Sequence, residues 1–293
     1  MNELEIGDSF MPHDALKVSL ARFACHAKDV KEAVVIIPPC EPPYKHMAAV
    51  VRVGEDVVVK YGPYVSAKEQ ETIRFIAENT PVPVPQVYGV HEGDDGNTYI
   101  VMEFISGTPL DLVWDSLEVS QKEKLAHQLR EYFEELRELR GNFIGSVHEG
   151  PCKDIYFDEG ADKGPFTTEV DMNVAIVEAV RKGSGLTEDF VTCTLPGLPH
   201  NHAIVFSHGN FGVTHVIVDS EHENVRAIVG WQRSGFFPEY WDFVNALTLT
   251  IAPFRSDWVL YVEKILKPYY DEYPHWCQLR MSARWRRQMA GRC

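Results

Sequence analysis

Residues able to do chemistry gather in one stretch of the sequence, residues 203–242. An apolar run at 203–206 reads as a buried strand, and the loop after it carries His208 and Asn210. A second apolar run at 215–218, a polar turn and a returning run at 225–231 predict a hairpin followed by another loop. This order of strand, loop, hairpin and loop commonly presents polar groups in a cleft.

The polar groups of this stretch are neutral or weakly titrating: His208, Asn210, His215 and Gln232. They can donate hydrogen bonds to a carbonyl oxygen, and an imidazole such as that of His215 can move a proton near neutral pH. With aromatic residues close by in sequence, the cleft suits an uncharged, largely apolar organic molecule. The aromatic residues are Phe211, Trp231, Phe236, Phe237, Tyr240 and Trp241.

The same stretch resembles the catalytic loop of aminoglycoside phosphotransferase and choline-kinase-like enzymes, most closely their fungal branch. The family pattern of His-Gly-Asp, four residues, Asn, a hairpin and Ile-Asp-Trp-Glu falls on residues 208–210, on His215 and on residues 229–232. Residues 235–242 resemble the family's Gly-x-x-Pro-Glu-Tyr-Trp-Glu/Asp run. The resemblance covers residues 50–273 and implies an α+β, two-lobed protein-kinase-like fold.

The frame matches the family, whereas the residues that carry its chemistry differ. The resemblance puts the family's catalytic aspartate on Asn210, its metal-binding asparagine on His215, its metal-binding aspartate on Gly230 and a neighbouring acid on Gln232. Phosphoryl transfer depends on a positioned acceptor and on Mg²⁺ held by carboxylates against the phosphates. Asn cannot take a proton as a carboxylate does, and Gly offers no ligand. Four such changes predict a pocket without kinase chemistry and without a metal.

The elements before this stretch fit a small β-rich lobe. Residues 47–61 predict a β-hairpin, and Ser66 can cap a helix that runs to residue 78. By resemblance, Lys60 matches the phosphate-binding lysine and Glu69 its helix partner, with Glu71 as a second choice. The apolar strand at 99–105 resembles the family's hinge, and this resemblance implies that backbone groups at Glu103 would meet an adenine. We predict Lys60, Glu69 and Glu103 to be vestigial nucleotide-binding residues. Two alternatives stay open: Lys60 is a solvated lysine at a strand end, and Glu69 is only the second residue of a capping box.

The elements after residue 105 predict a mainly helical lobe. Ser120 can cap a long amphipathic helix over 121–140, and residues 183–202 predict a long loop that rims the acceptor pocket. Further helices are predicted at 110–117, up to 181, at 242–251 and at 258–270. The predicted domains are an N-terminal helical extension (1–33, with a helix at 13–30), a small lobe (34–105), a mainly helical lobe (106–279) and a basic tail (280–293).

Composition narrows the class of protein. The 293 residues carry a net charge of −15, which argues against nucleic-acid binding, while five arginines near the C-terminus predict a solvated or frayed tail. Six widely spaced cysteines without a C-x-x-C pair argue against zinc and for reduced thiols in a cytoplasmic protein. Neither an N-terminal signal segment nor a membrane-spanning run is found, so neither secretion nor membrane insertion is expected.

Three functions fit these observations. The first is a cofactor-independent enzyme of cyclisation, cycloaddition or isomerisation in fungal secondary metabolism, with Asn210, His215 and Gln232 as catalytic residues and His208, Phe211, Trp231, Phe236 and Phe237 as substrate-binding ones. The second is a pseudokinase that binds a partner or nucleotide without turnover, and the third a weak phosphotransferase. Trp231, Tyr240 and Trp241 are also explained as core, and His208 as a support of its loop. The first function predicts a cavity between the altered loops and the 183–202 rim.

Overall fold

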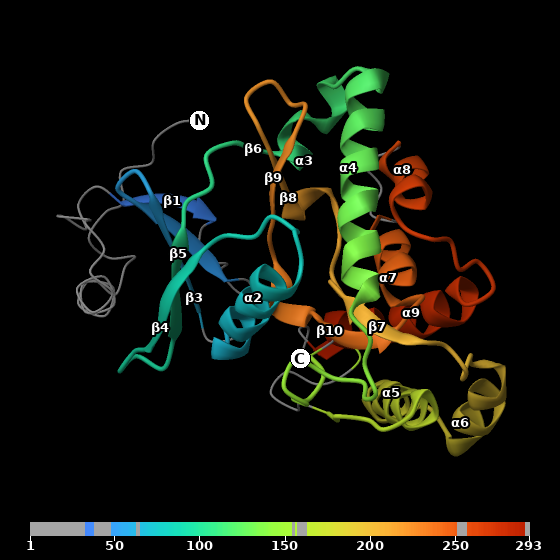
Figure 1. The fold of residues 1–293 in the computed structure, drawn as a ribbon. Coiled ribbons are helices and arrows are strands. Elements are labelled where there is room, and N and C mark those ends of the chain that lie inside the picture. The colour runs from blue at the N-terminus through green and yellow to red at the C-terminus, as the bar shows by residue number, and fades with distance from the viewer. Residues whose placement is uncertain are drawn as a thin grey trace. The chain divides into compact units, whose positions relative to one another are not determined.

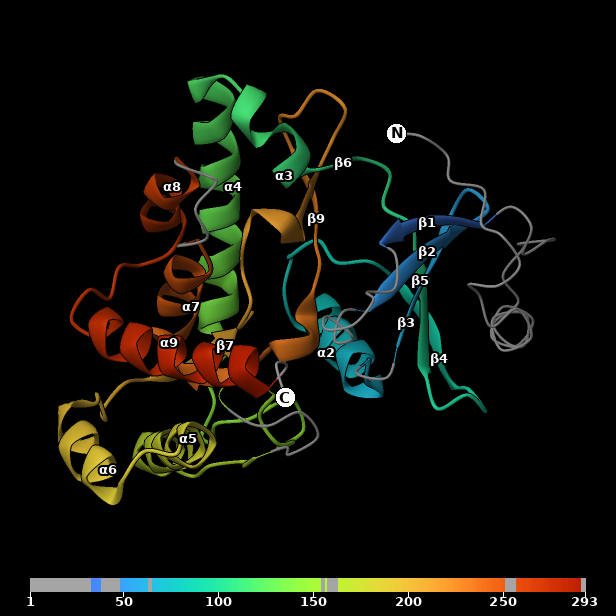
Figure 2. The same cartoon turned by 180° about the vertical axis from the view of Figure 1, so that it is seen from behind.

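The computed structural model describes residues 33–37, 48–62, 65–153, 156, 163–250 and 257–290. The predicted helix at 13–30 and the extended connector at 38–44 lie outside these residues. The chain divides into two compact units, Met1–Glu78 with Pro83–Ser106, and Asn79–Val82 with Gly107–Cys293. Figures 1 and 2 show the elements of both from opposite sides, and each unit is described by itself.

An antiparallel five-stranded sheet forms the smaller unit (Figure 1). Its spatial order is β1-β2-β3-β5-β4, so the predicted hairpin is the pair β2–β3. Val51, Val59 and Val101 lie in register across β2, β3 and β5 and are fully buried, because β-branched side chains pack well on a pleated surface. The strands are β1 (Ala33–Ile37), β2 (Ala49–Val53), β3 (Val57–Gly62), β4 (Val87–Glu92) and β5 (Thr98–Glu103).

The helix α2 (Ala67–Asn79) follows β3 and begins where it was predicted. The Ser66 hydroxyl accepts a hydrogen bond from the backbone N–H of Lys68 at 3.3 Å. Glu69, proposed as the partner in a capping box, directs both carboxylate oxygens to Lys60 Nζ instead. Lys60 lies in β3, the strand that precedes α2, and its positive charge orients the Glu69 carboxylate.

The long helix α4 (Val119–Glu138) is the central element of the larger unit (Figure 1). It was predicted to start after Ser120, but the cap is Glu118, whose side chain and that of Gln121 each bind the other's backbone N–H. This reciprocal capping box satisfies two N–H groups that Ser120 would leave open. The buried face of α4 packs toward α8 and β7 and carries Leu125, Leu129, Phe133 and Leu136.

The segment predicted as one long loop, residues 183–202, contains a helix. After α5 (Glu169–Ser184) ends at the left-handed Gly185, the short helix α6 (Glu188–Thr194) follows, and a 3₁₀ turn (Leu195–Gly197) completes the segment. Glu188 and Asp189 in the first turn of α6 favour a helix start there. Glycines and prolines are typical of loops, so their presence in this segment did not predict the helix of seven residues between them.

Three helices close the chain: α7 (Trp241–Thr250), α8 (Trp258–Ile265) and α9 (Tyr273–Ala290). The start of the predicted basic tail is therefore helical, and the prediction that it is solvated is wrong for Arg280. The Arg280 side chain is only 1% exposed and donates to the Asn245 carboxamide of α7. Its apolar neighbours on α9, Trp276 and Leu279, bury that face of the helix.

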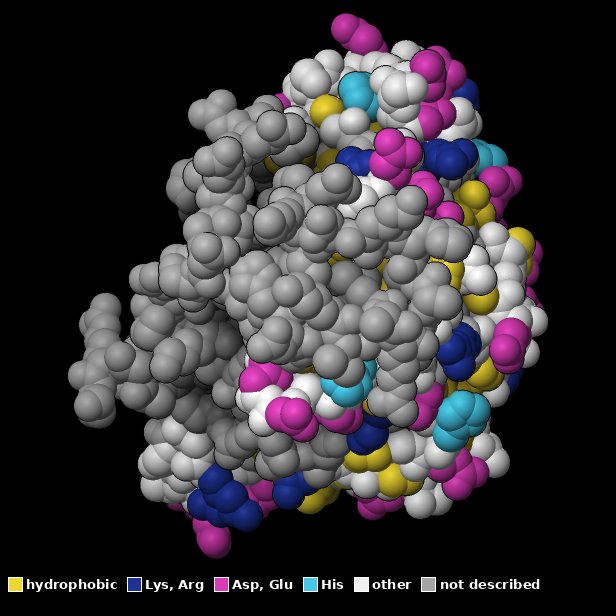
Figure 3. Space-filling model, turned by 90° about the vertical axis from the view of Figure 1, so that its left-hand side faces the viewer, with side chains coloured by type: hydrophobic (Ala, Val, Ile, Leu, Met, Phe, Trp, Pro, Cys, Tyr) yellow, Lys and Arg dark blue, Asp and Glu magenta, His cyan; other side chains and the backbone are white. Residues whose placement is uncertain are grey.

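Short strands bring the chemically interesting loops together. β7 (Ile204–Ser207) pairs with β10 (Gly235–Pro238), and β8 (Val216–Val218) lies between β9 (Val225–Ile228) and β6 (Thr108–Pro109). The short helix α3 (Leu110–Val113) follows β6 and continues into a 3₁₀ turn. No helix in the described part of the chain is long and apolar enough to cross a bilayer. On the face in Figure 3, acidic and basic side chains are interspersed among the residues drawn in colour.

Candidate active site

The loop after β7 is anchored by a buried carboxylate. Asp242, at the start of α7, accepts hydrogen bonds from the backbone N–H groups of His208 at 3.1 Å and Gly209 at 2.8 Å. Burial raises the pKa of Asp242 to about 6, although the two N–H groups oppose that shift. Gly209 has φ +73°, and a Cβ there would lie 2.3 Å from the Arg233 carbonyl oxygen, so the loop requires glycine at this point.

His208 supports the loop from within the core. Its side chain is fully buried, and both ring nitrogens are used: Nδ1 accepts from the Asn210 N–H at 3.2 Å, and Nε2 lies 3.0 Å from the Val229 carbonyl oxygen. Because Nδ1 accepts, Nε2 must carry the single proton of a neutral ring. Burial, with a smaller contribution from His215, lowers the pKa of His208 to about 3. His208 therefore supports its loop, as the alternative interpretation had it, and its role in substrate binding stays a prediction.

Asn210, His215 and Arg233 form one polar cluster. The Asn210 Nδ2 lies 3.5 Å from His215 Nε2, and Arg233 Nη1 donates to Asn210 Oδ1 at 3.5 Å. All three residues are half-buried, whereas the residues that hold their loops, such as His208 and Gly209, are buried. The structure thus joins two of the predicted catalytic residues to a guanidinium that sequence analysis missed. Gln232 is half-buried beside them in a 3₁₀ turn, Trp231–Arg233.

Gly230 and His215 fit each other sterically. Gly230 has φ +88°, and a Cβ built on it would lie 2.3 Å from Cδ2 and 2.7 Å from Nε2 of His215. The imidazole therefore occupies the space that a side chain at position 230 would need. The backbone bond from Val229 N–H to the His215 carbonyl oxygen, 2.9 Å long, holds the two segments at this separation.

The family's Mg²⁺ does not fit this set of residues. Proteins hold Mg²⁺ through one or two carboxylates together with substrate phosphates, but the matching positions offer no carboxylate: they offer a carboxamide, an imidazole and a glycine next to a guanidinium. The one buried acid nearby, Asp242, is committed to backbone N–H groups. Within the described residues no group of three or more His, Cys, Asp and Glu side chains could hold a metal ion.

The aromatic residues predicted to bind substrate are packed in the core instead. Phe211 lies 4.4 Å from Phe133 between ring centroids, and Phe237 stacks on Trp241 at 5.0 Å. Phe236 packs edge-on against Phe206, and Trp231 donates its indole N–H to the Ile228 carbonyl oxygen. Side chains this buried position the loops, and the substrate-binding role of these four residues stays a prediction: Phe211, Trp231, Phe236 and Phe237.

In the smaller unit, Lys60 and Glu69 form a tight ion pair. Lys60 Nζ lies 2.7 Å from both Glu69 oxygens, and the Glu69 side chain is only 3% exposed. Lys60 is therefore not simply a solvated lysine. Glu103 has its backbone N–H bonded to the Gln86 carbonyl oxygen at 2.8 Å, and its carboxylate accepts from the Gln86 N–H. That N–H supports the strand edge, so it is not presented to an adenine.

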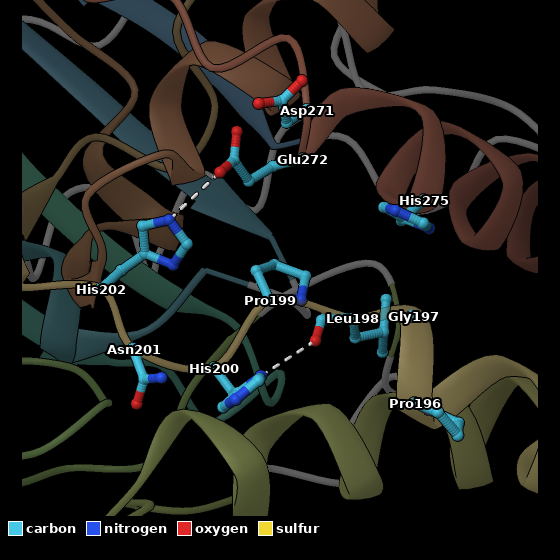
Figure 4. A pocket seen from close by; sticks show the side chains of 10 residues that line it. All are labelled: Pro196, Gly197, Leu198, Pro199, His200, Asn201, His202, Asp271, Glu272 and His275. Atoms are coloured by element: carbon cyan, nitrogen blue, oxygen red, sulfur yellow. Dashed lines mark hydrogen bonds and ion pairs between the residues drawn. The ribbon is translucent and has the colours of Figure 1, made fainter.

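A cavity of about 460 Å³ lies in the larger unit, next to the segment predicted as a rim. It is lined by residues 196–202, by Asp271 and Glu272, and by His275 (Figure 4). Asn210, His215 and Gln232 do not line it. This cavity is therefore not the one predicted between the altered loops and the rim.

Fold and site together define a two-lobed kinase-like protein, as predicted, and the comparisons agree. Residues 48–276 match the phosphotransferase enzyme family, and the chain belongs to that family. The structure resembles aminoglycoside-3'-phosphotransferase of type VIII, with 17% identity, 92% of this chain and 98% of that chain covered and a TM-score of 0.58. It also resembles the ADP-bound aminoglycoside phosphotransferase APH(2'')-Ib, with 13% identity, 94% and 86% covered and a TM-score of 0.58. No curated protein matches the sequence.

Proposed function

We propose that this member of the phosphotransferase family transfers no phosphate and instead converts a small organic molecule without a cofactor. The observation that carries the proposal is the fit of the His215 ring into the space beside Gly230. A deleted carboxylate alone would leave a weakened kinase site. Here the His215 imidazole fills the space that an aspartate side chain at position 230 would need, which supports a site built around different groups.

The chemistry proposed for this site is the binding and polarisation of a carbonyl oxygen. Arg233 and the Asn210 carboxamide offer N–H donors, and a guanidinium stabilises negative charge that develops on such an oxygen. His215 then serves as the base: Nε2 takes a proton from the carbon next to the carbonyl and returns it to another carbon of the same molecule. Electrons and protons balance within the substrate, as in an isomerisation, and a cyclisation or cycloaddition would use the same donors without the proton transfer.

The substrate proposed is small and largely apolar apart from this oxygen. The acidic net charge of −15 supports a partner other than nucleic acid. The setting, fungal secondary metabolism in the cytoplasm, is supported by the resemblance of the motifs and by the reduced-thiol pattern of the cysteines. Gln232, half-buried beside Arg233, is proposed as a further hydrogen-bonding group toward the same substrate.

A second candidate function has its own observation. The Lys60–Glu69 pair retains the lysine and glutamate that the family uses on the nucleotide side, with both carboxylate oxygens engaged. This favours a pseudokinase, which holds nucleotide or a partner and performs no turnover. The two candidates differ in what His215 does: His215→Ala slows a catalysed rearrangement and leaves the partner binding of a scaffold unchanged.

A kinase assay on the wild-type protein and a restored variant tests the proposal. The variant Asn210→Asp/His215→Asn/Gly230→Asp brings back the family's residues and removes the steric conflict together. With ATP, Mg²⁺ and a panel of hydroxylated acceptors, we expect no transfer by the wild type. Wild-type turnover at ordinary kinase rates, about 1–100 s⁻¹, would overturn the proposal in favour of a phosphotransferase.

The restored variant separates the other two readings. If the pocket was rebuilt for another ligand, the triple variant remains inactive although it is folded, since the residues around the loops no longer suit the acceptor. If it becomes an efficient kinase, the pocket was never rebuilt and the pseudokinase is the better function. Far-UV circular dichroism of the variant ensures that inactivity is not loss of folding.

A further inference from the structure

The cavity of the larger unit lies at the opposite end of β7 from the altered loops. Its lining ends at His202, two residues before β7, whereas Asn210 follows the other end of the strand. A strand of four residues spans about 13 Å, so a molecule bound here does not reach Asn210. The volume of about 460 Å³ is within the range of small-molecule sites.

The polar side of this cavity is acidic. Asp271 and Glu272, which precede α9, both line it, and Figure 4 shows their side chains on the wall beside His202. The opposite wall is formed by prolines and Leu198, and the His200 ring is directed to the Leu198 carbonyl oxygen at 3.4 Å. The cavity therefore combines a carboxylate pair with a short apolar surface: Pro196, Leu198 and Pro199.

A buried carboxylate behind the wall adds to the negative charge. Glu169, at the start of α5, is 5% exposed and lies 3.2 Å from His202 Nδ1, while Glu272 lies 3.2 Å from His202 Nε2. Both contacts are hydrogen bonds only when both ring nitrogens carry protons, so His202 contributes one positive charge at most. Two carboxylates, of Glu169 and Glu272, thus contact this one ring, and Asp271 lines the same cavity.

The other groups packed around His202 do not balance that charge. The rings of Tyr240 and Tyr269 lie edge-on against the imidazole and are neutral. The pKa of Glu239 is lowered by its hydrogen bond from Tyr269 and by the nearby cations, and its carboxylate is paired with Arg137 and Lys267. His200 and His275 are the remaining titratable groups that line the cavity.

We propose that this cavity binds a small organic cation, a primary amine with a short alkyl chain. The ammonium group donates to the carboxylates of Asp271 and Glu272, and the chain lies on Pro196 and Pro199. Burial of the alkyl chain and pairing of the charge favour the same orientation, because the acidic and apolar walls face each other across the cavity. The site is independent of the function proposed for Asn210 and His215.

Isothermal titration with n-butylamine, against n-butanol as the uncharged control at equal ionic strength, tests this site. We expect millimolar binding of the amine and at least tenfold weaker binding of the alcohol. Asp271→Asn should weaken amine binding about tenfold without disturbing His202, since Asp271 is exposed. Glu272→Gln should weaken it further. The proposal fails if amine and alcohol bind equally, if neither binds in the millimolar range, or if Asp271→Asn has no effect.

A matched variant shows whether the site or the overall acidity attracts the amine. Glu131→Gln/Glu134→Gln removes two charges from exposed positions of α4 in the same unit. It should leave amine binding within twofold of the wild type. If it weakens binding as much as Asp271→Asn/Glu272→Gln does, the attraction is general and the cavity is not a site.

Discussion

The two units treat the charged groups of the phosphotransferase family in opposite ways. In the smaller unit, Lys60 and Glu69 keep the family's pair at 2.7 Å, with the glutamate buried. In the larger unit, Asn210 and Gly230, which the resemblance of the motifs sets at the positions of the family's acids, lie beside a guanidinium and an imidazole. A buried ion pair is costly to break from one side, whereas acids that hold a metal leave without such a cost when the metal is no longer needed. Retention of the pair alone therefore does not demonstrate nucleotide binding.

Lys60→Met gives the largest expected effect. Without its partner, Glu69 becomes a buried, uncompensated charge, which destabilises the smaller unit by about 3 kcal/mol. All six tryptophans belong to the larger unit, so hydrogen exchange of the β3 and β5 amides is the appropriate measurement. Lys60→Met/Glu69→Leu should recover most of the loss. If Lys60→Met leaves the exchange of these amides unchanged, the ion pair contributes no stability to the smaller unit and the comparison changes.

Gly230→Asp should destabilise the larger unit by about 2–3 kcal/mol. The aspartate meets both an unfavourable positive φ and the His215 ring. Gly185→Asp is the matched control, because it has φ +67° and open space around its Cβ, so it carries the backbone cost alone. Urea unfolding followed by tryptophan fluorescence measures both. Adding His215→Asn should rescue Gly230→Asp and not Gly185→Asp; equal losses for the two single variants would show that the ring is no obstacle.

Acid sensitivity of the larger unit should decrease in His208→Gln. The folded-state pKa of about 3 lies below the ordinary value of about 6.5, so unfolding takes up a proton on acidification. The stability that neutral His208 contributes is fully present above pH 6.5 and is lost as pH falls, by about 2 kcal/mol between pH 7 and pH 5. Asp242, whose pKa is raised to about 6, changes stability in the opposite direction, so the difference between wild type and variant is what isolates His208. Identical pH profiles would contradict the buried neutral imidazole.

The smallest effect concerns Mg²⁺. Any stabilisation by ATP should come from the Lys60 side and be the same with Mg²⁺ or EDTA, within about 1 kcal/mol, because no carboxylate of the loops at 210 and 230 anchors the metal. Thermal-shift titration measures this difference. Stabilisation that requires Mg²⁺ would show that the larger unit still holds a metal and would remove the contrast between the units.

Much of the fold could be predicted from local patterns. The β2–β3 hairpin and α4 have strong periodicity, and the family motifs placed the loops at 208–210 and 229–232. Helix starts were harder, because Glu118 and Ser120 are both plausible caps and only the reciprocal bonds with Gln121 decide between them. Arg280 looked solvated because sequence shows its charge and not the helix face on which it lies.

The site was less predictable, since its essential contacts join residues distant in sequence. Arg233 directly follows the family motif at 229–232, so its charge next to that motif is a sequence signal for its place in the site. The contact between His215 and Gly230 depends on a positive φ and on the pairing of two strands, and no spacing rule encodes it. The aromatic residues near the loops were predicted to bind substrate because proximity in sequence does not show which of these side chains are buried in the core.

The His215–Gly230 contact also sets an order on mutational history. An aspartate cannot return to position 230 while the imidazole is present, and His215→Asn on its own leaves a void beside the glycine. Each single step toward the metal-binding residues is therefore disfavoured, and only the pair of changes restores a packed arrangement. We propose that such epistasis is a barrier to reversion, because successive single mutations toward the family's residues pass through a destabilised intermediate.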